Sequence, residues 1–222
     1  QFDDMVSALR KKGIFDIDGC VDSEKANIES ALSPCGLNLI VAADDTKARE
    51  LLEDWKLYDR KAMYYPAKDI IFYQADLNGN LITTERMCVL KELISNGKNS
   101  GGLNIITTFD AFMEKLPGLG IIKDNIVTLN KADSIDLEDF TGSLIRSGYE
   151  KTAEVEAAGQ FAVRGGIIDI FPLTDENPVR IELWGDDIDS VRAFDIVSQR
   201  SIEELDGVEI YPASEMILDR EM

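Results

Sequence analysis

Apolar and polar positions follow two different patterns along this chain, one in each half. In the first half, apolar runs alternate with stretches whose apolar residues recur every three or four positions. The run 37–43 is typical of a buried parallel strand. The stretch after it starts at the N-cap candidates 44–46. It then carries one apolar helical stripe, formed by Ala48, Leu51, Leu52 and Trp55.

The same patterns predict the other elements of this half. Helices are expected at 23–32, 84–95 and 109–116, and strands at 63–66 and 103–108. Because strands and helices alternate, we expect a parallel sheet with helices on its faces, in a first domain at 1–120.

After the Pro-Gly stretch at 117–120, the apolar positions alternate with a period of two. Strands are expected at 125–129, 150–156, 160–171, 179–184, 189–195 and 207–211, with turn residues at 185–187. One helix is expected from Leu137 to Ser147, started by Asp136 and stopped by Gly148. These elements predict a small α+β domain at 121–212, followed at 213–222 by the start of another segment.

Composition narrows the classes of function. The 222 residues are 45% hydrophobic, which suffices for a sizeable core. Asp and Glu number 42 against 23 Lys and Arg, a formal charge of −19. Nucleic acids and anionic membranes are bound largely through Lys and Arg, so a protein partner is favoured over either. The sequence contains no His, which excludes Ser-His and Cys-His nucleophile pairs and imidazole-ligated zinc.

Cysteine usage and the chain ends bear on the cellular compartment. Cys20, Cys35 and Cys88 are widely spaced and form no C-x-x-C pair, which favours buried thiols in a reducing cytoplasm. No apolar run approaches the roughly 20 residues of a membrane span, and the start lacks the pattern of a signal peptide. We expect a cytoplasmic protein without membrane contact. A start without Met and an end inside a helical pattern also suggest a piece of a longer chain.

A glycine and a lysine at 19–26 stand where a phosphate-binding loop would precede the first helix. Such a loop reads G-x-x-x-x-G-K-[ST]: its second glycine lets backbone N–H groups approach phosphate, and its hydroxyl holds magnesium. Gly19 and Lys25 fit this pattern, but Glu24 replaces the glycine and Ala26 replaces the hydroxyl. Asp22 and Glu24 would also repel a polyphosphate. We therefore favour an ordinary helix start over ATP binding.

Two carboxylates on neighbouring expected strands offer a second catalytic hypothesis. Asp169 and Glu182 are candidates to hold a magnesium ion for a nuclease reaction. Such pairs arise easily among 42 acidic residues, and no lysine at a nuclease-like spacing accompanies them. Solvated surface carboxylates are the favoured interpretation.

The strand pattern at 179–184 is the most informative stretch. Its period of two puts one apolar set on the core face and leaves Arg180, Glu182 and Trp184 on the other. Arginine beside tryptophan is enriched at protein interaction hot spots. Arg164, before a Gly-Gly pair, is expected to point outward as well, which would complete a protein-binding patch of Arg164, Arg180 and Trp184. The pattern is equally consistent with a Trp184 covered by its own domain.

Several of these stretches together resemble one protein family. Residues 159–172, 179–190, 194–195 and 198–201 closely resemble the bacterial transcription-repair coupling factor family (Mfd). The N-terminal region of that family is similar to UvrB of nucleotide excision repair. In UvrB the phosphate-binding loop is intact, whereas 19–26 resembles the degenerate loop of the coupling factors.

The resemblance implies an α/β fold. A degenerate RecA-like, P-loop-type parallel-sheet domain, similar to UvrB domain 1a, would be followed by a small α+β domain similar to UvrB domain 2, with an antiparallel sheet. The second domain is the one that docks on UvrA. The family's docking residues fall on Arg164, Arg180 and Trp184, although relatives often have Phe at the last position.

The resemblance also implies a function without catalysis in this chain. The chain would recruit UvrA to stalled RNA polymerase in transcription-coupled repair. The parent would be an ATP-dependent DNA translocase, with ATP and magnesium only in its motor domains and with RNA polymerase and DNA bound by other domains. Another part of the parent would mask the docking face until polymerase is engaged. The alternatives are a UvrB-type nucleotide hydrolase and a metal-dependent nuclease.

Overall fold

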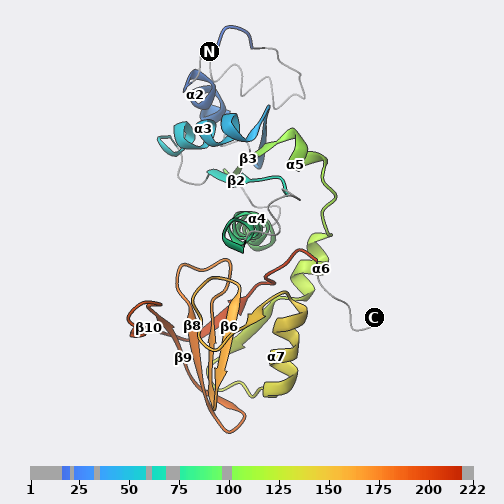
Figure 1. Cartoon of the computed structure of the whole chain (residues 1–222). Coiled ribbons are helices and arrows are strands. Elements are labelled where there is room, and N and C mark those ends of the chain that lie inside the picture. The colour runs from blue at the N-terminus through green and yellow to red at the C-terminus, as the bar shows by residue number, and fades with distance from the viewer. Residues whose placement is uncertain are drawn as a thin grey trace. The chain divides into compact units, whose positions relative to one another are not determined.

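The computed structural model describes residues 17–20, 23–32, 36–58, 62–68, 76–96 and 102–216. Contacts within the chain define two compact units, one within 1–70 and 92–115 and one within 71–91 and 116–222 (Figure 1). Helix α4 (Asp76–Asn96) contributes residues to both units. The domain limits expected from the sequence, 1–120, 121–212 and 213–222, stay a prediction.

The first unit is built on a three-stranded parallel sheet with the strand order β1-β3-β2. Every residue of the central strand β3 is buried, as is usual for a parallel strand covered on both faces. The parallel sheet expected in the first half is therefore confirmed. The strands are β1 (Asn38–Ala42), β2 (Ala62–Tyr65) and β3 (Asn104–Thr108), and the described helices are α2 (Ser23–Leu32), α3 (Asp45–Lys56) and α5 (Phe109–Met113).

Helix α3 forms as its apolar stripe predicts. Asp44 caps its first turn, because the side chain accepts a hydrogen bond from the backbone N–H of Lys47 at 2.8 Å. Ala48 and Trp55 are buried in the core of the unit, and two leucines between them pack against that core. The stripe thus holds α3 against the sheet.

Glu29 on α2 makes the stability of the first unit depend on pH. Burial raises its pKa to about 7 from the ordinary 4.5, although nearby Lys25 acts in the opposite direction. Between these two values the unfolded chain is ionised while the folded carboxyl still holds its proton, so the stability contributed by Glu29 falls as pH rises. Below 4.5 both states are protonated, and the effect vanishes.

We therefore expect the variant Glu29→Gln to gain stability relative to the wild type as pH rises from about 4.5 to 7, and to gain no more above that. Urea unfolding at several pH values, followed by circular dichroism, measures the difference. Glu53→Gln, on the exposed side of α3, is the matched control for replacing a helix glutamate by glutamine. A constant difference between wild type and Glu29→Gln across this range would contradict the prediction.

The described residues of the second unit form two β-sheets and, besides α4, two further helices. Its six-stranded sheet has the order β10-β9-β8-β7-β6-β5, antiparallel except for β5 and β6, and β11 pairs with β4 in a separate two-stranded sheet. The small α+β arrangement expected here is confirmed. The strands are β4 (Val127–Asn130), β5 (Glu150–Lys151), β6 (Gln160–Arg164), β7 (Ile167–Ile170), β8 (Val179–Trp184), β9 (Asp187–Phe194), β10 (Ser201–Leu205) and β11 (Gly207–Ile210), and the helices are α6 (Leu119–Asp124) and α7 (Leu137–Arg146).

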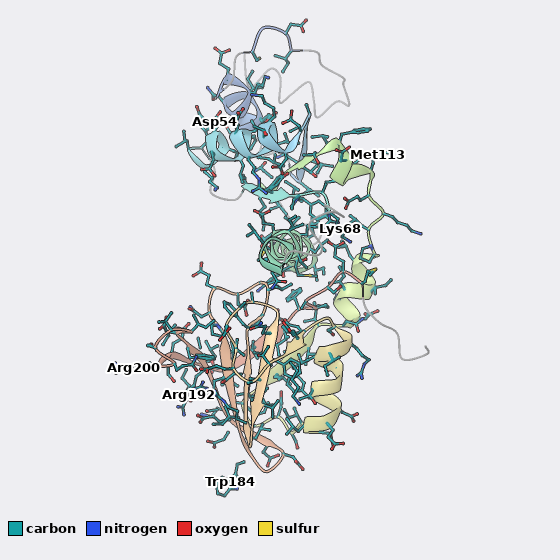
Figure 2. All side chains as sticks on the ribbon, viewed as in Figure 1. Asp54, Lys68, Met113, Trp184, Arg192 and Arg200 are labelled. Carbon is teal, nitrogen blue, oxygen red and sulfur yellow. The ribbon has the colours of Figure 1, made fainter. Side chains whose placement is uncertain are left out.

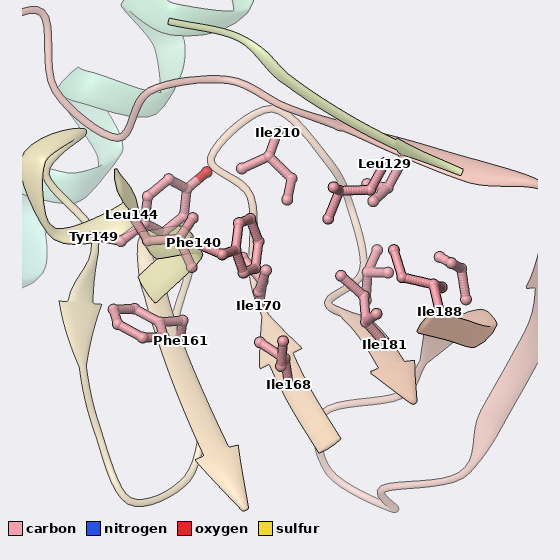
Figure 3. Close-up of a cluster of buried hydrophobic side chains, with 13 residues drawn as sticks. Leu129, Phe140, Leu144, Tyr149, Phe161, Ile168, Ile170, Ile181, Ile188 and Ile210 are labelled. Atoms are coloured by element: carbon pink, nitrogen blue, oxygen red, sulfur yellow. The ribbon is translucent and has the colours of Figure 1, made fainter. Parts of the chain in front are cut away.

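The core of this unit lies on one face of the six-stranded sheet. Phe161, Ile168 and Ile181 point from three neighbouring strands toward side chains of α7 and of the two-stranded sheet (Figure 3). Tyr149 adds a polar contact within it, because its hydroxyl donates to the carbonyl oxygen of Tyr211 at 2.8 Å. One face of the sheet is thereby used for folding, and the opposite face stays available for function.

Helix α7 begins and ends at the predicted signals. Asp136 accepts a hydrogen bond from the backbone N–H of Asp139 at 2.9 Å, and Gly148 follows the helix with φ +92°. A side chain at Gly148 would also place its Cβ 2.7 Å from the Cβ of Ser214. Glycine is therefore required here by both conformation and space.

Other expected elements differ in extent. The strand expected at 160–171 is two strands, because Gly165 with φ +63° turns the chain between β6 and β7. Only two residues of the expected strand 150–156 pair, as β5. Helix α4 begins at Asp76, well before the expected 84. Strand β10 and helix α6 were not predicted.

No helix in the described ranges has both the length and the apolar character needed to cross a bilayer.

Candidate protein-binding site

The candidate site lies on the outer face, by which we mean the face of β6, β7, β8 and β9 opposite the core. The strand register aligns Asp169, Arg180 and Arg192 in one row across three of these strands. The next row brings Arg164 and Glu182 onto the same face, with Ile167 between them. The outward direction predicted for both arginines is confirmed.

Asp169 joins the two predicted arginines. Its side chain is only 2% exposed, and its Oδ2 lies 2.5 Å from Nη2 of Arg164. Arg180 binds the same carboxylate with two donors, Nε to Oδ1 at 2.7 Å and Nη2 to Oδ2 at 2.9 Å. A buried carboxylate needs such compensation, and the paired geometry with Arg180 is the strong form of this hydrogen bond.

Arg180 is held from further sides. Its Nη2 also donates to Oε1 of Gln199 at 2.9 Å, and its guanidinium lies 4.5 Å from the centre of the Phe194 ring. The hydrogen bond to Asp169 raises the pKa of Arg180 above its ordinary value, against the opposing effect of partial burial. The guanidinium is therefore fixed in position and fully charged.

Trp184 stands at the end of the sheet, where β8 turns into β9. Its side chain is 83% exposed, and Figure 2 shows it clear of the strands. It lies on the same strand as Arg180 and four residues further on, a span of about 13 Å in an extended strand. Of the two possibilities left open by the sequence, the exposed Trp184 is the correct one. An exposed tryptophan on the same sheet as two fixed arginines gives the composition of a protein interaction hot spot.

Residues 127–216, which carry this site, match the family described as "UvrB interaction domain". They form a UvrB interaction domain. The chain is also similar to curated transcription-repair-coupling factors. It is 35% identical to that of Bacillus subtilis (strain 168) over 162 residues, 73% of this chain and 13% of the relative. It is 33% identical to that of Staphylococcus haemolyticus over 206 residues, 91% of this chain and 17% of the relative.

The likeness to Staphylococcus epidermidis (strain ATCC 12228) has the same extent, with 33% identity over 210 residues, 93% of this chain and 18% of the relative. The resemblance to the coupling-factor family is therefore confirmed over most of the chain. The chain spans less than a fifth of the length of these relatives.

Within the UvrB interaction domain, the carboxylates of the nuclease hypothesis have other partners. Asp169 is bound by two arginines, and Glu182 accepts from the Ser190 hydroxyl at 2.8 Å and lies 3.4 Å from Nη2 of Arg192. Among the described residues, no group of three or more acidic or cysteine side chains is placed to hold a metal ion. The two carboxylates serve to position arginines.

The loop considered for phosphate binding lies outside the UvrB interaction domain, at the start of the first unit. Gly19 has φ +82°, while Glu24 and Lys25 are exposed on α2. Ala26 is fully buried in the core of the unit, so the position of the magnesium-binding hydroxyl is used for packing. Asp22 lies outside the described residues.

The cysteines fall partly outside the described chain. Cys20 and Cys88 are free and half-buried, and Cys35 is not among the described residues. Burial raises the pKa of the Cys88 thiol above its ordinary value, which keeps it protonated. This agrees with the structural thiol expected at Cys88.

The contacts that hold Arg180 join several strands and a turn, and the pattern of one strand does not predict them. Asp169 was considered only as a metal ligand, and Gln199 and Phe194 were assigned no role. These contacts could have been predicted from residues that face one another on neighbouring strands. Which residues face one another depends on the strand register, and the turn at Gly165 sets that register. That turn was interpreted as part of a continuous strand.

Proposed function

We propose that the second unit docks on UvrA through Arg164, Arg180 and Trp184. The observation that carries this proposal is that a UvrB interaction domain presents two fixed arginines on one sheet face and an exposed tryptophan at the end of the same sheet. Two or three such residues, buried together at an interface, commonly supply about 2 kcal/mol or more each.

This docking would make the chain a recruitment module, with no catalysis of its own and no bound cofactor. The first unit fits a degenerate RecA-like domain, since its sheet is parallel and its phosphate-loop positions carry Glu24 and Ala26. We propose that the whole protein acts in the cytoplasm, in transcription-coupled nucleotide excision repair. It would bring UvrA to stalled RNA polymerase, with ATP-driven translocation on DNA performed by other domains, one of which masks the docking face until polymerase is engaged.

Titration calorimetry of this chain against UvrA tests the proposal. We expect saturable binding that Arg180→Ala and Trp184→Ala each weaken by about tenfold or more. The matched controls are Leu57→Ala, an equally exposed apolar side chain of the first unit, and Arg146→Ala on α7. Both controls should bind like the wild type.

Thermal unfolding separates lost docking from lost folding. Trp184→Ala should leave the midpoint unchanged, because the side chain is exposed. Arg180→Lys keeps the charge but loses the paired hydrogen bonds, and should also bind weakly. A folded wild-type chain that does not bind UvrA would refute the proposed function.

A further inference from the structure

The two docking arginines share one acceptor atom. Oδ2 of Asp169 lies 2.5 Å from Nη2 of Arg164 and 2.9 Å from Nη2 of Arg180. Two guanidinium groups placed this close would repel one another without a negative charge between them. Asp169 therefore fixes the spacing of the pair as well as the direction of each side chain.

From this arrangement we infer that Asp169 is a positioning residue for docking, and that the arginine pair it holds receives a carboxylate of the partner protein. The inference rests on the proposed function and names the chemistry of the contact. Asp169 does not itself reach a partner, since its side chain is 2% exposed, against 46% for Arg164 and 19% for Arg180. It acts through the two guanidinium groups.

The remaining donors of the pair fit a carboxylate. The bonds of Arg180 among the described residues use Nε and Nη2, and that of Arg164 uses Nη2. Each guanidinium therefore keeps Nη1 for a partner. Each Nη1 can donate a directed, charge-assisted hydrogen bond, and one such bond from each arginine would hold the two oxygens of a planar carboxylate.

The conformation of the turn after β9 indicates that the hydrogen bond between Gln199 and Arg180 is a fixed part of the site. Gln199 has φ +58°, a left-handed conformation that non-glycine residues seldom adopt. Its side chain accepts from Arg180 and donates from Nε2 to the carbonyl oxygen of Ile196 at 3.0 Å, which fixes the amide. Backbone strain of this kind is found where a side chain must be held in place.

The local charge also points to an acidic contact. The strand register places Arg180 and Arg192 in one row with Asp169, and Arg164 binds the same carboxylate. The exposed acids of β9, Asp187 and Asp189, lie toward the hairpin end of that strand, and the chain as a whole has a formal charge of −19. The net negative charge of the chain would repel an acidic partner as a whole. Attraction between these arginines and one carboxylate of the partner would orient the partner at this site.

The variant Asp169→Asn tests the inference, because positioning and simple charge predict opposite results. Removing a negative charge would by itself tighten binding to an acidic partner. Loss of positioning would instead weaken it, and we expect the dissociation constant for UvrA to rise about tenfold. The change should lie in the dissociation rate, with the association rate unchanged or faster. Surface plasmon resonance measures both rates.

Two further variants keep the test decisive. Glu209→Gln removes the same charge from β11, in the separate two-stranded sheet, and should not weaken binding. Gln199→Gly suits the left-handed backbone and deletes only the amide that holds Arg180, so we expect it to weaken binding about threefold. This variant can be measured even if Asp169→Asn does not fold.

The outcomes are distinct. Weaker binding by folded Asp169→Asn, with faster dissociation, supports the inference, and so does weaker binding by Gln199→Gly. A folded Asp169→Asn that binds UvrA as tightly as the wild type, or more tightly, overturns the inference. The proposed function is tested separately by Arg180→Ala and Trp184→Ala, and it would still stand if these two variants bind weakly. If Asp169→Asn is unfolded, wild-type affinity of Gln199→Gly overturns the inference.

Discussion

Replacing Glu215 by glutamine is expected to lower the free energy of unfolding of the second unit by about 3–5 kcal/mol. Glu215 binds Arg86 of α4 through two hydrogen bonds, one of them between Nη2 and Oε2 at 3.1 Å. The side chains are 3% and 1% exposed, so the variant would take the charge from an acceptor that a buried guanidinium binds. Breaking one half of a buried pair costs far more than breaking a surface pair.

Urea unfolding followed by circular dichroism gives the free energy for this comparison. The control is Glu204→Gln, whose partner Lys131 lies 3.0 Å away on the surface, with both side chains more than half exposed. This control should shift the midpoint little. Equal midpoints for the two variants would show that the Arg86–Glu215 pair contributes no more than an exposed one.

A loss of similar size is expected for Phe161→Ala. The ring is fully buried on β6 and belongs to the core shown in Figure 3, with residues of β7, β8 and α7. Truncation leaves a cavity that the surrounding sheet cannot close, and such changes cost about 3–5 kcal/mol. Thermal unfolding should show a clearly lower midpoint.

The matched control for the core variant is Ile202→Ala on the edge strand β10, where the side chain is about half exposed. It should unfold close to the wild type. Phe161→Leu, which fills part of the space, should fall between the two. A midpoint for Phe161→Ala near that of the wild type would mean that the ring does not support the core.

Local sequence patterns predicted the elements whose limits depend only on nearby residues, such as strand β8 and helix α7. Strand β8 has the predicted limits because core-facing Val179, Ile181 and Leu183 alternate with residues of the opposite face along its whole length. Helix α7 lies between Asp136 and Gly148 because a cap and a left-handed glycine define its ends. Where side chains alternate and the ends are marked, no tertiary information is needed.

Other elements depend on tertiary pairing. Apolar, strand-forming residues lie on both sides of the glycine pair at 165–166, so the stretch 160–171 was predicted as one strand, although Gly165 turns the chain between β6 and β7. Strand β10 has an exposed, acidic sequence and forms because β9 offers it a pairing edge. Such a strand has no periodic signal of its own.

The candidate site was likewise predictable from local pattern only in part. Alternation indicated that Arg180 and Trp184 point away from the core, because that depends on one strand. The shared acceptor at Asp169 required the register of three strands, which follows from turn geometry. Whether any other segment covers Trp184 was likewise a tertiary question.

The positions of the two tryptophans have a spectroscopic consequence. Trp55 is fully buried in the first unit, and Trp184 is exposed at the end of the second unit's sheet. An indole emits at longer wavelength in water than in an apolar core, so the emission spectrum of the chain is the sum of two separable components. Unfolding of the first unit changes the short-wavelength component from Trp55. Any contact made at the hairpin end changes the long-wavelength component from Trp184, and the chain thus carries a separate optical reporter in each unit.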